Sequence, residues 1–147
     1  MVNLSYRKAH PPSEVIDEAI GRKDWLSAYS NAIAYFEMWG YWLLVYYCRN
    51  EKLYIKKRIE DLSVSNLTLV LYLLKLIDQN TFTKMTEAIR KRNAILHAGS
   101  KGESKRFLGE NEQEEAIKVL ENAKYCIDKL KEGTIKQVKS EKSLQVT

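Results

Sequence analysis

The chain has 147 residues, of which 45% are hydrophobic and 29% are charged. These proportions exclude a disordered chain and favour a single globular domain with one core. The formal net charge of +5 favours an anionic partner without identifying it. The start of the chain lacks the apolar run of a signal peptide, and the longest apolar run, residues 38–48, is too short to cross a bilayer. We therefore expect a cytoplasmic protein that does not enter a membrane.

The first elements in chain order are an arm and two helices. Residues 1–12 form the arm, which closes with two prolines. Ser13 is the expected N-cap of a short helix that ends near Gly21. Asp24 is the expected cap of a long helix over residues 25–49. Its second half is apolar nearly all round, so this helix needs neighbours on more than one side.

A basic connector over residues 49–63, helical in part, leads into a third helix. Ser65 or Asn66 opens this helix, whose apolar run LTLVLYLLKLID is too long for a typical strand. Residues 78–80 have the composition of a turn. A fourth helix begins at Thr81 or Thr83 and is expected to end about His97, because glycine follows at position 99.

A fifth helix starts with a capping box of Asn111 and Glu114 and is expected to stop at Gly133. Residues 134–147 contain few apolar side chains, which predicts a flexible tail. No segment alternates apolar and polar residues over a useful length. The sequence therefore predicts one all-α domain over residues 13–133, an up-and-down bundle of four or five helices.

The cysteines and histidines predict no metal site and no cofactor. Cys48 and Cys126 lie far apart, each among apolar residues with helical spacing, so we expect two reduced, buried thiols. His10 and His97 are 87 positions apart, and no acidic cluster accompanies them. This is a poor set of ligands for any metal ion.

Arg92 is an unusual residue for its position. On a helical wheel of about 100° per residue it projects from the apolar side of its helix, between Met85 and Ala88. A guanidinium among hydrophobic side chains is costly unless a carboxylate pairs with it or it reaches a wet cleft. Glu37 on the second helix is the candidate partner, and an anion bound at a crevice between helices is the other candidate. Both can apply at once.

His97 follows Arg92 by five positions and so lies about 140° around the helix from it. The two side chains are not neighbours within one straight helix. For them to act together, either the helix loosens before Gly99 or a second copy of the helix supplies one of them. The alternative is that His97 only complements the dipole at a helix C-terminus.

The segment RNAILH, residues 92–97, resembles the R-x4-6-H motif of the HEPN superfamily in its R-N-x-x-x-H form. The order of the predicted helices agrees, because the motif ends a helix that follows a buried helix and a short polar turn. The resemblance spans residues 13–132. It departs from the subgroup whose motif continues His-x-Tyr, since position 99 is glycine.

The resemblance implies a homodimer in which two motif helices face each other across a cleft. It implies a metal-independent endoribonuclease of toxin or antiviral-defence type, with a nucleotidyltransferase-like antitoxin as a possible partner. Arg92 and His97 would be the catalytic pair, supported by Asn93. Because other HEPN proteins have lost activity, the alternative is a non-catalytic module that binds nucleotide, RNA or protein. A helical interaction protein with a structural Arg92–Glu37 pair is the third interpretation.

These residue types suit the cleavage of single-stranded RNA. The 2′-hydroxyl beside the scissile phosphate is the nucleophile, and an imidazole can take its proton or protonate the leaving oxygen. A fixed guanidinium stabilises the charge that grows on the phosphoryl oxygens. The expected products are a 2′,3′-cyclic phosphate and a 5′-hydroxyl. Basic residues around the motif, among them Arg90, Lys91 and Lys101, are the candidate RNA-binding residues.

Overall fold

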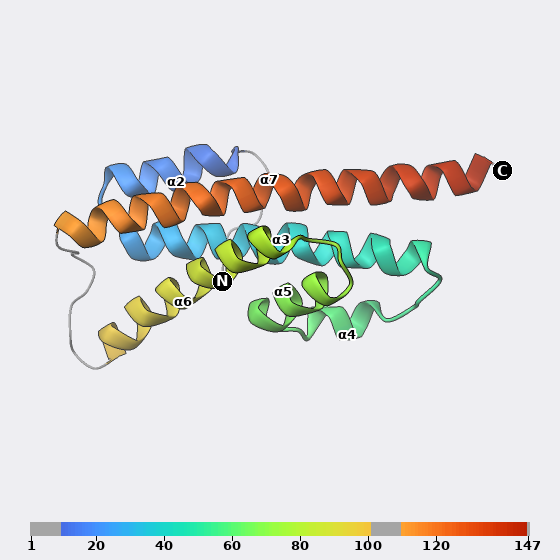
Figure 1. The fold of residues 1–147 in the computed structure, drawn as a ribbon, viewed down its shortest axis with the longest axis horizontal. Coiled ribbons are helices and arrows are strands. Elements are labelled where there is room, and N and C mark those ends of the chain that lie inside the picture. Colours follow the sequence, from blue (N-terminus) through green and yellow to red (C-terminus); the bar gives the residue numbers. More distant parts are fainter. Residues whose placement is uncertain (1–9, 101–109, 147) are drawn as a thin grey trace.

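The structure, a computed structural model, describes residues 10–100 and 110–146 (Figure 1). The described residues form six helices and no strand, which confirms the predicted all-α class. The helices are α2 (Pro12–Gly21), α3 (Trp25–Asn50), α4 (Lys56–Glu60), α5 (Val64–Leu73), α6 (Gln79–Ser100) and α7 (Glu110–Val146).

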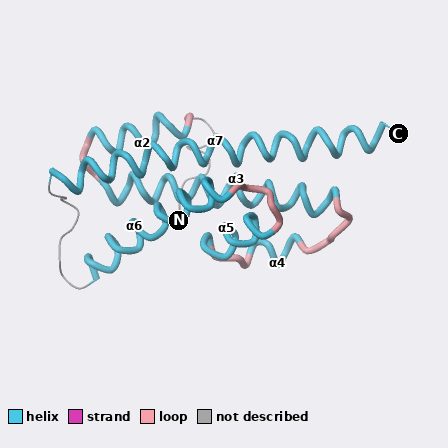
Figure 2. The backbone as a smooth tube through the Cα atoms, in the orientation of Figure 1, coloured by secondary structure: helices cyan, strands magenta, loops and turns pink. Residues whose placement is uncertain are grey.

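Four helices, α2, α3, α6 and α7, run in alternating directions along the long axis of the molecule (Figure 1). The short helices α4 and α5 connect the end of α3 to the start of α6 (Figure 2). The main helices therefore follow each other in the up-and-down order. As a result α6 and α3 run in opposite directions, and α6 slants away from α3 toward its end (Figure 1).

The long helices α3 and α7 form the centre of the bundle and make the most extensive contact of any pair. The helix α2 packs on both of them, and so does α6. Large apolar side chains are removed from water between these helices, each stabilising the fold by roughly 1.5–3 kcal/mol. The largest fully buried ones include Trp25, Tyr29, Tyr35, Phe36, Leu43, Leu120, Ile127 and Leu130.

The start of α2 differs from the prediction. The N-cap residue is Pro11 and not Ser13, and Pro12 occupies the first helical position. Proline suits this position because its fixed φ is already helical and its missing N–H would have no partner there. The end of α2 at Gly21 agrees with the prediction.

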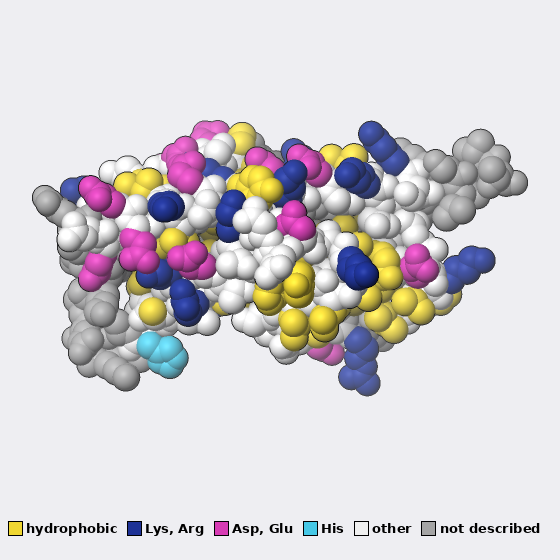
Figure 3. Space-filling model, in the orientation of Figure 1, with side chains coloured by type: hydrophobic (Ala, Val, Ile, Leu, Met, Phe, Trp, Pro, Cys, Tyr) yellow, Lys and Arg dark blue, Asp and Glu magenta, His cyan; other side chains and the backbone are white. Residues whose placement is uncertain are grey.

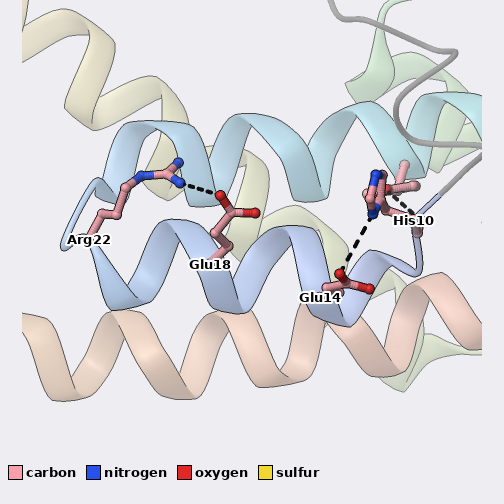
Figure 4. Close-up of polar contacts among 5 residues, drawn as sticks. His10, Glu14, Glu18 and Arg22 are labelled. Carbon is pink, nitrogen blue, oxygen red and sulfur yellow. Dashed lines mark hydrogen bonds and ion pairs between the residues drawn. The ribbon is translucent and has the colours of Figure 1, made fainter.

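Polar contacts lie along the outer side of α2 (Figure 4). The carboxylate of Glu14 is 3.6 Å from Nδ1 of His10, and Arg22 donates to Glu18 at 2.7 Å. The hydroxyl of Tyr35 on α3 donates to the backbone oxygen of His10 at 3.4 Å. His10 therefore belongs to the structural contacts at the start of the described chain.

Asp24 caps α3 as predicted, because its side chain accepts a hydrogen bond from the backbone N–H of Ser27 at 3.1 Å. The helix ends at Asn50, one residue beyond the predicted end. Part of the basic connector forms α4. The next helix, α5, begins earlier than predicted, since the hydroxyl of Ser63 accepts from the backbone N–H of Asn66.

The predicted stop at Gly133 is wrong, and residues 134–146 continue α7 instead of forming a separate tail. Gly133 serves packing, because a Cβ there would lie 3.2 Å from Cδ1 of Leu43 on α3. Farther along, the side-chain amide of Asn50 donates to the backbone oxygen and to Oε1 of Gln137, at 3.0 and 2.7 Å. Contacts with α3 thus extend α7 past its glycine.

Cys48 and Cys126 are both buried free thiols, in agreement with the prediction. Burial raises the pKa of the Cys48 thiol, and it raises the pKa of Cys126 to about 12. None of the described helices combines the length and the apolar character that crossing a bilayer requires.

Candidate functional site

The helix that carries the motif, α6, is firmly anchored at its start. The side chain of Asp78 accepts a hydrogen bond from the backbone N–H of Thr81 at 2.8 Å. This bond satisfies one of the N–H groups that have no partner within the first turn. The ring of Phe82 stacks on Tyr72 of α5 with 4.5 Å between ring centroids. These contacts fix the position of α6 against α5.

One side of α6 packs into the bundle, and Arg92 lies in that row. Met85, Ala88 and Ile95 are buried, and Arg92 falls between the last two in the same helical register. Its side chain is half-buried. Leu96 lies next to this row but is 48% exposed. The last turns of α6 therefore extend beyond the part of the bundle that covers its beginning.

The guanidinium of Arg92 contacts its neighbour in the sequence. Nε donates to Oδ1 of Asn93 at 2.9 Å. Among the described residues no carboxylate forms an ion pair with Arg92, and Glu37 is exposed on α3. The expected Arg92–Glu37 pair is therefore not formed.

The antiparallel packing of α6 on α3 explains why this pair is absent. Glu87 acts electrostatically on Tyr29, so these two residues lie at similar heights in the bundle. Arg92 is farther toward the start of α3, whereas Glu37 is farther toward its end. Helical rise separates the two along the axis by roughly 20 Å. A helical wheel shows the angle of a residue around one helix, but not its height relative to residues of a neighbouring helix.

Lys91 is part of a contact between α6 and α7. Its Nζ donates to Oε1 of Glu115 at 2.7 Å, and this hydrogen bond is the main reason that the pKa of Glu115 lies below its ordinary value. The positive charge of Arg90 lowers that pKa further. Burial, together with Glu115 and Glu87, raises the pKa of Tyr29 beneath them. Lys91 therefore helps to join two helices.

Of the three predicted RNA-binding residues, Arg90 is exposed, Lys91 pairs with Glu115, and Lys101 lies outside the described residues. Acidic and basic side chains are mixed over α2 and the first half of α7 in the view of Figure 3. The described side chains on that face therefore form no uniformly basic track.

His97 is exposed near the end of α6, as Asn93 is one turn earlier. The helix continues through Gly99 to Ser100, so it does not loosen before the glycine. His97 consequently keeps its angular separation of about 140° from Arg92. Within the chain as described, the imidazole and the guanidinium do not converge on one point. No group of three or more potential metal ligands occurs among the described residues.

Two features were not foreseen from the sequence. The Lys91–Glu115 contact joins residues 24 positions apart, and no local pattern signals it. The other feature is the exposure of Leu53, Tyr54 and Ile55 between α3 and α4. The signal for it, an apolar triplet between basic residues, is visible in the printed sequence.

No family model, curated protein or solved structure matches the chain. The resemblance to HEPN proteins therefore depends on the motif residues Arg92, Asn93 and His97 and on the order of the helices.

Proposed function

We propose that the protein is a metal-independent endoribonuclease, of toxin or antiviral-defence type, that cuts single-stranded RNA at the end of α6. One observation carries the proposal. Arg92 occupies a place in the packing row of α6, yet no described carboxylate pairs with it and its side chain reaches solvent. A guanidinium placed in this way has donors left for an anion, and a phosphodiester is the anion that the motif resemblance implies.

Each motif residue has a distinct role in the proposed reaction. The 2′-hydroxyl attacks the adjacent phosphorus, a P–O bond to the 5′-oxygen breaks, and a 2′,3′-cyclic phosphate and a 5′-hydroxyl result. His97 transfers a proton between these oxygens and solvent. Arg92 stabilises the negative charge on the phosphoryl oxygens. Asn93 accepts from Nε of Arg92 and so orients its guanidinium toward the phosphate.

The proposed active form is a homodimer. Arg92 and His97 point in different directions from one straight helix, so a second copy of α6 is needed to supply the missing group. Leu96 lies between the two on the helix and is 48% exposed, which supports an apolar contact at this end. In a two-fold dimer, Arg92 of one chain would face His97 of the partner subunit, and two equivalent sites would form.

The alternative is a non-catalytic module that binds RNA, nucleotide or a protein through the same end of α6. The specific observation in its favour is the pairing of Lys91 with Glu115. This pairing neutralises one positive charge on the surface that would hold an RNA substrate, so among the ligands of such a module it favours a nucleotide or a protein.

The deciding experiment incubates the purified protein with single-stranded RNA in EDTA and identifies the end groups of the products. The expected result is cleavage with cyclic phosphate and 5′-hydroxyl ends, which His97→Ala abolishes while the helical circular dichroism remains. His10→Ala is the matched control, because it removes the other histidine of the chain and should leave cleavage unchanged. Salt-dependent RNA retention without products would contradict the nuclease and support the binding module.

A mixing experiment tests the composite site. Arg92→Ala and His97→Ala should each be inactive, but after exchange of subunits the mixed dimer contains one site with both groups intact. Random exchange between two-fold dimers restores about a quarter of the parent activity. If each variant is inactive and the mixture is inactive as well, although light scattering shows dimers that exchange, the two groups do not act across subunits.

A further inference from the structure

The loop between α3 and α4 exposes three consecutive large apolar residues. Leu53 is 49% exposed, Tyr54 is 87% exposed and Ile55 is 48% exposed. A turn with positive φ at Lys52 ends α3, and the backbone N–H of Leu53 donates to the oxygen of Cys48 at 2.7 Å. The hydrogen-bonded turn therefore holds the apolar segment in a projecting position.

Basic residues outnumber acidic ones around this apolar loop, where Glu51, Glu60 and Asp61 are exposed as well. Residues 49–58 contain five Lys or Arg residues and one acidic residue, Glu51. The side chains of Arg49, Lys52 and Arg58 are exposed. A second copy docked through the same loop would bring like charges together, which opposes self-association. The complementary surface is one that is negatively charged outside and apolar beneath.

More apolar surface lies beside the loop on the same face of the molecule. Leu69, Leu73 and Leu74, on α5 and the turn after it, are 43%, 67% and 37% exposed. Figure 3 shows hydrophobic side chains over α5 and α4, with basic and some acidic side chains around them. This face is broader than a single exposed side chain.

A cavity of about 530 Å³ opens next to the loop. Leu53, Ile55 and residues of α3 and α4 form its apolar walls, and Arg49 and Arg58 also line it. Apolar side chains and guanidinium groups therefore lie next to each other, as the acyl chains and phosphates of a lipid layer do.

We propose that, contrary to the expectation from the sequence, this face binds the surface of a membrane that contains anionic lipids. The loop inserts Leu53, Tyr54 and Ile55 into the region between headgroups and acyl chains, where an amphipathic tyrosine ring is well accommodated. The basic residues remain at the level of the phosphates, and each strengthens binding about fivefold near an anionic leaflet. This inference does not depend on the proposed nuclease activity, because the loop belongs to other helices than the motif.

The test is co-sedimentation of the full chain with two kinds of vesicle, phosphatidylcholine alone and an equimolar mixture with phosphatidylglycerol. We expect retention on the mixed vesicles only, and weaker retention at higher salt.

Replacing the loop residues together, as L53S/Y54S/I55S, should weaken retention about tenfold or more, since the apolar contribution is lost. The charge-reversed variant K52E/R58E should weaken it as well. Ile117→Ser on α7 is the matched control and should bind like the parent, because it removes an apolar side chain of similar exposure, 41%, far along the bundle.

Three results would overturn the inference. The first is a parent chain that stays in the supernatant with the mixed vesicles. The second is retention that the triple loop variant leaves unchanged while circular dichroism shows that it is folded. The third is loop-dependent binding to polyglutamate, or a loop-dependent dimer in light scattering, without vesicle retention. That result would assign the face to an acidic protein or to a second copy.

Discussion

The two ends of α6 differ in how the bundle surrounds them. At its start, Asp78 caps the helix, Phe82 stacks on Tyr72, and Met85 is 1% exposed. At its end, Arg92 is half-buried, while Leu96 and His97 are exposed. The same helix is thus enclosed over its first half, whereas in its last turns Ile95 still packs on the core and its neighbours Leu96 and His97 are exposed.

Because of this difference, most residues of α6 that stabilise the fold and the residues proposed to act on RNA lie at opposite ends of the helix. Side chains at the enclosed end contribute to folding because they exclude water, and changes there are felt through the whole bundle. Leu96 and His97 at the open end lie largely in water, so replacing them costs the fold less. The motif residues Arg92, Asn93 and His97 all belong to the open end.

The largest expected effect comes from removing equivalent apolar groups at the two ends. Met85→Ala should lower the free energy of unfolding by about 2–5 kcal/mol, because it leaves a cavity among buried neighbours. Leu96→Ala should lower it by less than about 1 kcal/mol, since the side chain is already half in water. Urea denaturation at low protein concentration measures both. Equal losses would mean that the end of α6 is enclosed as well.

The second prediction concerns the close packing between α3 and α5, the helix on which the start of α6 packs. At Gly40 a Cβ would lie 3.1 Å from Cδ2 of Leu67 and 3.3 Å from Cδ1 of Leu71. We expect Gly40→Ala to destabilise by about 1 kcal/mol, because overpacking exceeds the gain in helix propensity. Gly21→Ala is the matched control, since a Cβ there meets nothing within 4 Å, and it should not destabilise. Thermal melts of both variants decide the sign.

A smaller change in stability is expected when Arg92 is replaced. Arg92→Met should alter the free energy of unfolding by less than about 1 kcal/mol, because no described carboxylate loses its partner. A structural ion pair, in contrast, would cost about 3–5 kcal/mol when broken. The proposed RNA cleavage should disappear in the same variant. A large drop in the urea midpoint would show that Arg92 serves the fold.

The smallest effect is a pH dependence at the start of α6. Hydrogen bonds from Thr81 hold the pKa of Asp78 below its ordinary value, with Lys129 and Lys84 adding to the effect. The folded state therefore favours the ionised carboxylate, and its contribution is present above about pH 4 and lost as the pH falls below it. Asp78→Asn keeps a capping side chain that does not titrate. Melting temperatures between neutral and acidic pH should fall less steeply for this variant than for the parent.

Local chemistry in the sequence predicted some helix ends correctly and missed others, such as the N-caps of α2 and α5. Asp24 caps α3 through its own side chain, and the helix end was missed by one residue only. The predicted stop at Gly21 was correct, but the stop at Gly133 failed because it depends on a tertiary contact. Gly133 lies against Leu43, so the small side chain allows two helices to approach and does not end α7. Local sequence does not distinguish these two uses of glycine.

The candidate site was foreseen in the same partial way. The angular position of Arg92 follows from helical periodicity and agrees with the row of buried residues around it. The predicted partner, Glu37, was wrong, because helical periodicity does not give the positions of two helices relative to each other along their axes. The Lys91–Glu115 contact depends on the packing of α7 on α6 in the same manner. The spacing of residues within α6 does not show how α6 is aligned along its axis with α3 or with α7.

The continuation of α7 beyond Gly133 affects a distant part of the chain. The Asn50 amide has both of its acceptors on Gln137, 87 positions away in the sequence. A groove formed by α3 and the last third of α7 is lined by Trp39, Trp42 and Tyr46. Truncation after Gly133 would remove the Asn50 acceptors and uncover the indole and phenol rings together. The shortened protein would lose order at the end of α3 and would aggregate through these rings.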